Sequence, residues 1–520
     1  MVALVVGGTL TTLIGPAQGD RRSPRKLADR PMAAERIALK RTLLSANEQT
    51  STAQPGVIVE QSFPHGLQAL VVTRDATLPD LRRSSPETIV EVRPGVWEVR
   101  RTIFVARGAT LSIEAPLVKE LRLLSTPARF ASIIARSADL EFRGRPDGRL
   151  LVRSWDPLAG HPDRVLRDGR ATIAVRGQSR LDASDATFAR LGFYLGTVSG
   201  FALWARGEDH GTGTVRNSRF VNNYNGAYSF GARRMSWIGN RFVHNRVYGF
   251  DPHTGSSNFL VQDNYAARNG RHGIIFSLAC HRNVIRQNLS EDNGWHGIVL
   301  DDGKHGNRPS NFNVVKANVV RGNAKVGIQI DGSAHNVVRR NRIVGSRQGV
   351  RILGPAKHNA VTRNWVVGAQ DFGVILYFPA RKTVVANNRI ADTPTGLRIH
   401  GSSFVSVTEN RIERVASHAV KVDESGQAGV QRIAIVGNRM QGSGTSPVRI
   451  SARGGHAVER RDNQISWNYP LMHDIGGLLR SFVGPGLWAL LFLLALAGPL
   501  LVRGSRATSR MPAEIERRNA

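Results

Sequence analysis

The feature that most constrains the fold is a repeat of about 23 residues that starts near residue 215. An asparagine recurs before an apolar position, at Asn217, Asn240, Asn264, Asn288, Asn318, Asn341, Asn364, Asn388, Asn410, Asn438 and Asn463. Successive asparagines lie 23, 24, 24, 30, 23, 23, 24, 22, 28 and 25 residues apart. Self-similarity at such a period is typical of solenoids, in which each unit packs on its neighbours.

Each unit consists of short strands and turns rather than helices. A glycine opens an alternating segment in successive units, as in "GFDPH", "GIIFS", "GIVLD" and "GIQID". Alternation with period 2 and many Val and Ile residues favour strands. Units of this length predict the coils of a right-handed parallel β-helix, with the asparagines stacked in a ladder that satisfies turn backbone groups. The predicted fold class is therefore all-β.

The rest of the chain divides around this solenoid. Strand-like segments at 89–116 and 150–158 extend the predicted β-helix domain to 89–465. The Arg-rich stretch 20–88 is expected to be an extension that caps the exposed sheet edges. Residues 1–19 hold an apolar run with a small-x-small site, which indicates a signal peptide or signal anchor.

The C-terminal end predicts a membrane anchor. Between Arg480 and Arg503 lie 22 residues without a charged side chain, enough for one helix to cross a bilayer. We expect a linker at 466–481, a transmembrane helix at 482–502 and a basic cytoplasmic tail at 503–520. The β-helix would then lie outside the cytoplasm, held at the cell membrane.

The charge of the chain indicates a polyanionic partner. The formal net charge is +31 and the isoelectric point about 11.4. No nucleic-acid module is visible, so nucleic acid is an unlikely partner and an anionic polysaccharide fits better. The single cysteine, Cys280, excludes an internal disulfide.

One short segment, "YGFDPHTGS", concentrates acid–base groups. Tyr248, Asp251 and His253 lie within six residues, and Pro252 separates the last two. Because proline removes a ladder hydrogen bond, it is avoided in central strands. A proline here indicates that local geometry serves a functional site.

The repeat also predicts which side chains lie beside this segment. With Phe250 and Pro252 facing the core, Asp251 and His253 face outward. The expected outward columns are Tyr228, Asp251, Ile275, Val299, Gln329 and Arg351, and beside them Phe230, His253, Ser277, Asp301, Asp331, Leu353, Tyr377 and His400. Tyr248, His272 and His296 would align at the turn before each glycine, with Arg246 and Arg271 nearby.

At these residues the chain resembles the mannuronan (alginate) C5-epimerase family. "YGFDPH" at 248–253 matches the family signature, "RHGII" at 271–275 is similar to its next coil, and "LRLL" (121–124) and "SWD" (154–156) resemble segments of periplasmic members. The resemblance covers roughly residues 90–465. Two positions depart from it: Thr254 stands where the family has an acidic residue, and Ser277 where members can carry an aspartate.

The resemblance implies epimerisation of a polyuronate by removal and return of the C5 proton. His253 is the candidate base and Tyr248 the candidate acid, or the reverse, while Asp251 would orient His253 or bind the substrate carboxylate. The expected substrate-binding residues are Arg271, Arg246, His272, His296, Asp301 and Tyr228, with either arginine able to neutralise the carboxylate.

Alternatives remain open from the residues. The same carbanion could lose its O4 substituent, as in a lyase, or the β-helix could bind carbohydrate without catalysis. No cofactor and no metal ligand set is expected; Ca²⁺ stays open, although no nonapeptide calcium repeat follows the helix. A polysaccharide synthase or export complex is expected as a partner on functional grounds.

Overall fold

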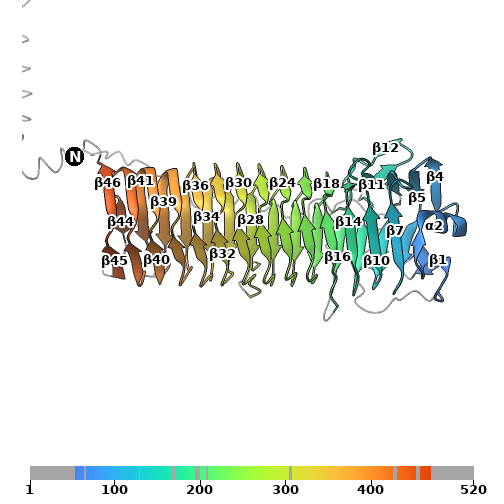
Figure 1. Cartoon of the computed structure of the whole chain (residues 1–520), viewed down its shortest axis with the longest axis horizontal. Coiled ribbons are helices and arrows are strands. Elements are labelled where there is room, and N and C mark those ends of the chain that lie inside the picture. Colours follow the sequence, from blue (N-terminus) through green and yellow to red (C-terminus); the bar gives the residue numbers. More distant parts are fainter. Residues whose placement is uncertain are drawn as a thin grey trace, which may run out of the picture.

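The molecule is a long tube built from stacked coils of β-strands (Figure 1). This computed structural model describes residues 53–63, 66–127, 129–166, 170–193, 199–205, 209–303, 307–424, 430–451 and 457–469. Each full coil contributes one strand to each of three rows, and strands in a row pair in parallel with the same strand of the next coil. The predicted parallel β-helix is therefore confirmed.

The first sheet is the row that carries the predicted site. Its strands are β2 (Leu67–Val72), β6 (Thr102–Val105), β9 (Ile133–Arg136), β13 (Ile173–Arg176), β16 (Phe201–Trp204), β19 (Ala227–Phe230), β22 (Phe250–His253), β25 (Ile274–Ser277), β28 (His296–Asp301), β31 (Val326–Asp331), β34 (Gln348–Leu353), β37 (Phe372–Tyr377), the later parts of β39 (Arg389–His400) and β41 (Arg411–Asp423), and β44 (Val448–Ser451).

The second sheet follows the first in each coil. Its strands are β3 (Ala76–Thr77), β7 (Thr110–Glu114), β10 (Asp139–Arg143), β14 (Leu181–Ser184), β17 (Thr214–Arg216), β20 (Ser236–Ile238), β23 (Leu260–Gln262), β26 (Val284–Arg286), β29 (Val314–Lys316), β32 (Val337–Arg339), β35 (Ala360–Thr362), β38 (Val384–Ala386), β40 (Val405–Thr408), β42 (Ile433–Val436) and β45 (Val458–Arg461).

The third sheet closes the tube. Its strands are β5 (Val96–Val99), β8 (Glu120–Leu124), β11 (Leu150–Asp156), β15 (Ala186–Ala189), β18 (Arg219–Val221), β21 (Arg241–Val243), β24 (Tyr265–Ala267), β27 (Leu289–Glu291), β30 (Val319–Arg321), β33 (Arg342–Val344), β36 (Trp365–Val367), the first parts of β39 and β41, β43 (Arg439–Ser443) and β46 (Gln464–Asn468). The short strand β12 (His161–Pro162) pairs with β11 as a side hairpin.

The repeated asparagines hold the bend between the second and third sheets. Asn288 shows the pattern: its Nδ2 donates to the Val261 carbonyl and to Asn318 Oδ1, both at 2.9 Å. Its Oδ1 accepts hydrogen bonds from the backbone and side chain of Asn264, also at 2.9 Å. The predicted ladder is present and buried from Asn240 to Asn438, and the half-buried Asn463 is its last rung. Asn217 is not part of it: this residue is exposed, and Ser218 takes the position before Asn240.

Apolar side chains fill the tube, because alternate residues of every strand point inward. Stacked phenylalanines mark the coils before the site, with ring centroids of Phe188 and Phe220 5.2 Å apart and those of Phe220 and Phe242 5.0 Å apart. Phe250 continues this stack 5.2 Å from Phe242. This packing fixes the inward face of β22 and so sets which side chains point out.

The N-terminal end is closed by elements of different kinds (Figure 1). Strand β1 (Ile58–Phe63) pairs antiparallel with β2, and β4 (Ile89–Arg93) antiparallel with β5. Helix α2 (Leu78–Ser84) starts with a capping box and buries Leu78 and Leu81. Parallel pairing begins with β2 and β6, upstream of residue 89.

Several predicted segments lie outside the described residues. These are the signal segment 1–19, the membrane span 482–502 and the tail 503–520, as well as most of the linker 466–481, whose first residues belong to β46. Within the part of the chain that the structure describes, no helix is long and apolar enough to cross a membrane.

Candidate active site

The sheet register around β22 agrees with the alignment of the repeats. Asp251 pairs with Tyr228 on the preceding coil, and His253 lies between Phe230 and Ser277. Ser277 pairs in turn with Asp301. Phe250 and Pro252 are buried, as predicted for inward positions. The column of acid–base groups expected on the first sheet is thus assembled from adjacent coils.

Asp251 is a buried carboxyl group in the middle of this sheet. Its exposed fraction is 3%, and its Oδ1 has no hydrogen-bond partner among the described residues. Burial raises the pKa of Asp251 well above its usual range, and the nearby Asp301 raises it further. The shift favours the protonated form of Asp251, which can donate a hydrogen bond.

His253 is half-buried and held by its neighbour in sequence. Its Nδ1 lies 2.7 Å from the Thr254 hydroxyl, and Nε2 makes no hydrogen bond to another described residue. Burial lowers the pKa of His253 to about 4, and Arg308 adds to this effect. The imidazole is neutral at physiological pH, with Nε2 free to take part in proton transfer.

Asp251 does not hydrogen-bond to His253 in this structure, although orientation of His253 was one of its two expected roles. The His253 ring hydrogen-bonds through Nδ1 to Thr254, and Asp251 Oδ1 has no hydrogen-bond partner among the described residues. Thr254 is the group that orients the ring instead. The departure from the family signature at 254 is thus a hydroxyl in contact with the imidazole.

Tyr248 lies at the turn that leads into β22. Its ring stacks on His272 at 5.1 Å and 6°, and His272 stacks on His296 at 4.8 Å and 10°. Burial and then Asp251 raise the pKa of Tyr248, while a hydrogen bond from Arg271 opposes them. The turn column predicted from the sequence is therefore a wall of three stacked rings beside Asp251.

Both histidines of this wall are uncharged. Burial lowers the pKa of His272 to about 3, with Arg271 and Lys325 contributing. Burial also lowers the pKa of His296, whose Nδ1 accepts a hydrogen bond from the Val326 backbone at 3.1 Å. A substrate would meet two neutral imidazoles rather than two cations.

The two arginines expected from the sequence differ in position. Arg271 hydrogen-bonds to Tyr248 and lies over the Trp295 ring, 4.7 Å from its centroid. Arg246 is exposed, and its side chain forms no hydrogen bond or ion pair with the residues described around the site. Only Arg271 is thus connected to the acid–base groups.

Arg308 is a third cation, which the sequence reasoning missed. It lies near enough to His253 to lower the pKa of the imidazole, and its carbonyl accepts a hydrogen bond from Ala279 at 2.7 Å. It belongs to the unit in which the asparagine spacing rises to 30 residues, between Asn288 and Asn318. That longer spacing was the available signal for a loop that reaches the site.

Carboxyl groups gather on the C-terminal side of His253. Burial raises the pKa of Asp301. Burial and then Asp301 raise the pKa of Asp302 to about 6, and burial, Asp301 and Asp302 raise the pKa of Asp331 to about 7. Like charges in adjacent coils disfavour ionisation. Among the described residues, no group of three or more His, Cys, Asp or Glu side chains is arranged to hold a metal ion.

Tyr228 borders the site on its N-terminal side. Its ring is buried, lies 5.7 Å from the His253 ring and stacks on Trp204 at 6.2 Å. Burial raises the pKa of Tyr228, with Asp251 adding to the effect. Tyr228 is thus a neutral aromatic contact beside His253.

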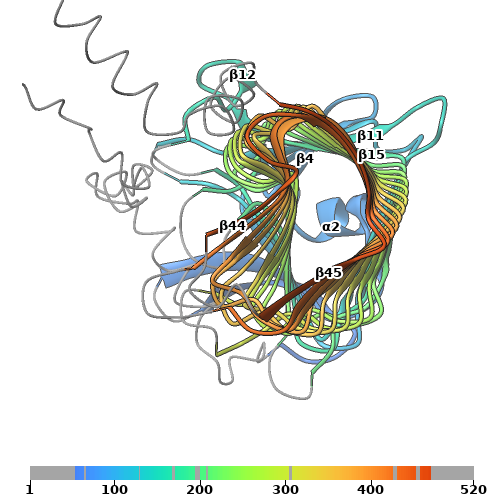
Figure 2. The same cartoon turned by 90° about the vertical axis from the view of Figure 1, so that its left-hand side faces the viewer.

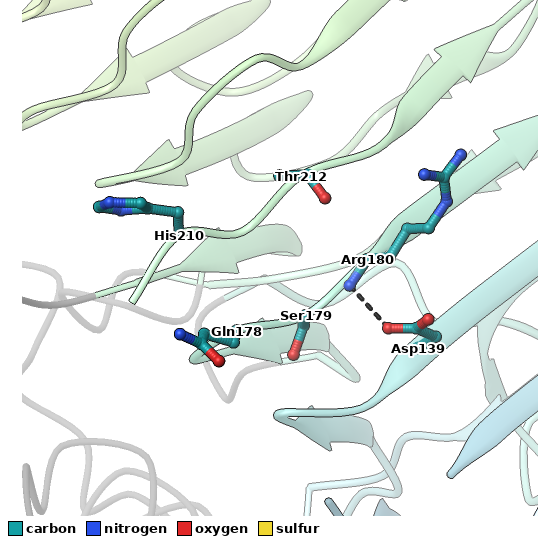
Figure 3. A pocket seen from close by; sticks show the side chains of 6 residues that line it. All are labelled: Asp139, Gln178, Ser179, Arg180, His210 and Thr212. Carbon is teal, nitrogen blue, oxygen red and sulfur yellow. Dashed lines mark hydrogen bonds between the residues drawn. The ribbon is translucent and has the colours of Figure 1, made fainter. Parts of the chain in front are cut away.

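A separate open depression of 320 Å³ lies at the bend between the first and second sheets (Figure 3). It is lined by Asp139, Gln178, Ser179, Arg180, His210 and Thr212. The Arg180 backbone donates to Asp139 at 2.9 Å, and Ser179 donates to the Arg176 carbonyl at 2.6 Å. None of the residues predicted for the site lines it.

Comparison with known proteins relates the chain to polysaccharide epimerases. It is 27% identical over 310 residues to a mannuronan C5-epimerase of Pseudomonas syringae pv. tomato, which covers 55% of this chain and 53% of that protein. It is 30% identical over 230 residues to the enzyme of that name from Pseudomonas aeruginosa, covering 41% and 40%. The chain thus spans about half the length of the curated relatives it matches.

Structural comparison gives the same fold. The crystal structure of the periplasmic alginate epimerase AlgG matches with a TM-score of 0.54 and 20% identity over 77% of this chain and 85% of that one. The model of the "Right handed beta helix region" matches residues 171–343 and 308–468, together more than half of the chain. The chain therefore belongs to the right-handed β-helix family, and its curated relatives are mannuronan C5-epimerases.

Proposed function

We propose that this protein is a polyuronate C5-epimerase that converts mannuronate to guluronate residues in an alginate-like polymer. The observation that carries the proposal is the group of Tyr248, Asp251 and His253, gathered on one face of the first sheet with Arg271 beside it. The names of the curated relatives support the same activity.

The reaction removes a proton from C5 of a uronate, where the hydrogen is α to a carboxylate. His253 is the proposed base, because its neutral imidazole has Nε2 free. A low pKa makes a weak base, but an anionic substrate bound beside the ring raises the pKa of the imidazole. Thr254 holds the ring in place while the proton moves.

Removal of this proton develops negative charge on the substrate carboxylate. Asp251 keeps its proton and would donate a hydrogen bond to a carboxylate oxygen, stabilising the charge as it forms. Arg271, and Arg308 from the long loop, would supply the opposing positive charge. Arg246, the other arginine expected to neutralise the carboxylate, is exposed, and its position does not support that role.

Tyr248 is the proposed acid that returns a proton to the opposite face of the sugar. Its raised pKa keeps the phenol protonated, while the neutral His253 is ready to accept a proton. These two protonation states favour His253 as base and Tyr248 as acid over the reverse assignment.

The proposed setting is outside the cytoplasm. The relative AlgG is described as periplasmic, which supports this location. The apolar segment 482–502 would anchor the domain to the membrane, where it could modify a polymer as a synthase or export complex releases it.

The test is proton NMR of polymannuronate incubated with the protein in D₂O, beside a His253→Gln variant. Guluronate signals with deuterium at C5, lost in the variant, support the epimerase. Unsaturated end groups instead would identify a lyase, since the same carbanion then loses its O4 substituent. An unchanged polymer that still binds would identify a carbohydrate-binding β-helix.

A further inference from the structure

A row of cationic side chains follows the bend between the second and third sheets; we name it the basic edge. Its members are Arg286, Lys316, Arg339, Arg340, Arg342, Arg363, Arg389, Arg411 and Arg439, with Trp365 among them. All are exposed except Arg286 and Lys316, which are half-buried. The asparagine ladder lies directly beneath and fixes the backbone of this bend.

Strand pairing makes the row continuous along the tube. Arg286, Lys316 and Arg339 occupy one column of the second sheet. Arg342, Trp365, Arg389, Arg411 and Arg439 occupy one column of the third sheet. With one strand spacing per coil, the seven coils span about 30 Å. Every coil in this length contributes at least one cation.

Most of these cations have no ion-pair partner among the residues that the structure describes. Lys316, Arg339, Arg340, Arg342 and Arg363 form no ion pair with any residue that the structure describes, whereas Arg389 and Arg411 share Glu413. The basic edge therefore presents positive charge that the fold does not neutralise, and like charges in neighbouring coils repel one another. A bound polyanion would relieve that repulsion.

Trp365 adds an aromatic surface in the middle of the row. Its exposed fraction is 39%, and the guanidinium of Arg342 lies 3.9 Å from its ring centroid. Arg389 lies 5.8 Å from the same ring. An exposed tryptophan held between arginines offers both a flat apolar face and charge, which suits a ring that carries a carboxylate.

The basic edge lies away from the candidate active site. In the end view, β44 of the first sheet and β45 of the second sheet lie on separate walls of the tube (Figure 2). In such a three-sided tube, the bend between the second and third sheets lies opposite the first sheet. The two features therefore cannot hold the same sugar. A long chain, or a second chain, would be needed to occupy both.

We propose that the basic edge is a second binding track for an acidic polysaccharide, outside the active site. A narrow, straight row of charges matches a linear polyanion. An anionic lipid surface fits less well, because the cations lie in a single row along one edge of the tube and only Trp365 adds apolar area for insertion. The identity of the sugar rests on the proposed function, whereas the inference that the ligand is a polyanion rests on the charges of the row. The track would retain long chains and leave short oligomers unaffected.

The test compares two triple variants of the full chain that lose the same charge. One changes Arg340, Arg342 and Arg363 to glutamine on the basic edge. The control changes Arg74, Arg93 and Arg107 to glutamine, which are exposed arginines at the N-terminal end. Titration calorimetry measures the Kd for polymannuronate at low and high salt, and turnover is measured on long polymer and on a short mannuronate oligomer.

We expect the basic-edge variant to raise the Kd for the polymer about tenfold at low salt, with the difference shrinking at high salt. Its kcat on the short oligomer should stay at the wild-type value. Equal Kd values for the two triple variants would overturn the inference. A basic-edge variant that binds the polymer as the wild type does, but binds phosphatidylglycerol vesicles more weakly, would also overturn it. If the basic-edge substitutions weaken polymer binding but the wild type shows no turnover, the second binding track stands and the proposed epimerase activity is wrong.

Discussion

Removal of one central rung of the asparagine ladder should destabilise the whole tube. In Asn288→Ala, the backbone N–H and side-chain amide of Asn264 lose their acceptor, and the Val261 carbonyl loses a donor. All three groups are buried, so water does not replace the lost partner. At about 1–3 kcal/mol for each unsatisfied group, with partial relaxation, the expected loss is on the order of 3–6 kcal/mol.

The matched control is the terminal rung, Asn463. It makes the same kinds of bonds, to Asn438 and the Ile435 carbonyl, but it is only half-buried. Asn438 and Ile435 are buried, but loss of the half-exposed Asn463 side chain opens their freed groups to water, so Asn463→Ala should cost no more than about 1 kcal/mol. The measurement is the free energy of unfolding from urea denaturation followed by circular dichroism. Equal losses for the two variants would refute the argument that burial of the ladder sets its contribution.

Four further outcomes test the site. His253→Gln should lower kcat by about 10²–10⁴-fold with an unchanged circular dichroism spectrum, since it removes only the base; an active variant would exclude His253 from that role. In the wild type, kcat/KM should fall as the pH drops through about 4, because protonated His253 cannot accept a proton. Thr254→Asp places a carboxylate beside Nδ1 and should move this acidic limb upward by about one pH unit; an unmoved limb would assign it to another group. Asp251→Asn keeps a neutral donor and should retain more activity than Asp251→Ala, whereas equal losses would indicate that Asp251 acts as an anion.

The repeat allowed much of the fold to be predicted, because equivalent positions in stacked coils lie one strand spacing apart. That rule placed Asp251 beside Tyr228 and His253 beside Ser277 without coordinates. The repeat did not predict how deeply these side chains are buried. Asp251 was expected on the outward face of the sheet, yet its side chain is almost inaccessible to solvent. Tyr228 lies next to Asp251 within this column and the Tyr248 ring lies beside it, and side-chain packing of that kind is not encoded in strand alternation.

Arg308 shows a second limit of the sequence. It lies on a loop that breaks the period, so no equivalent position in other units predicts where its side chain goes. The basic edge is different, because Arg342, Trp365, Arg389, Arg411 and Arg439 directly follow ladder asparagines and so occupy one equivalent position of the repeat. Function that depends on the register of the coils was predictable, whereas function that depends on loops and on side-chain packing was not.

The asparagine ladder also bears on how such a chain can change length. Each rung bonds only to its neighbouring rungs and to nearby strand backbone, and every rung offers the same donors and acceptors. Removal of one whole unit, such as 342–364, would bring Asn341 and Asn388 into the positions of adjacent rungs. The tube could thus be shortened or extended by complete coils at its C-terminal part, while the coils from β19 to β28 stay in contact. The length of the binding surface could then vary without any change in the groups that perform the chemistry.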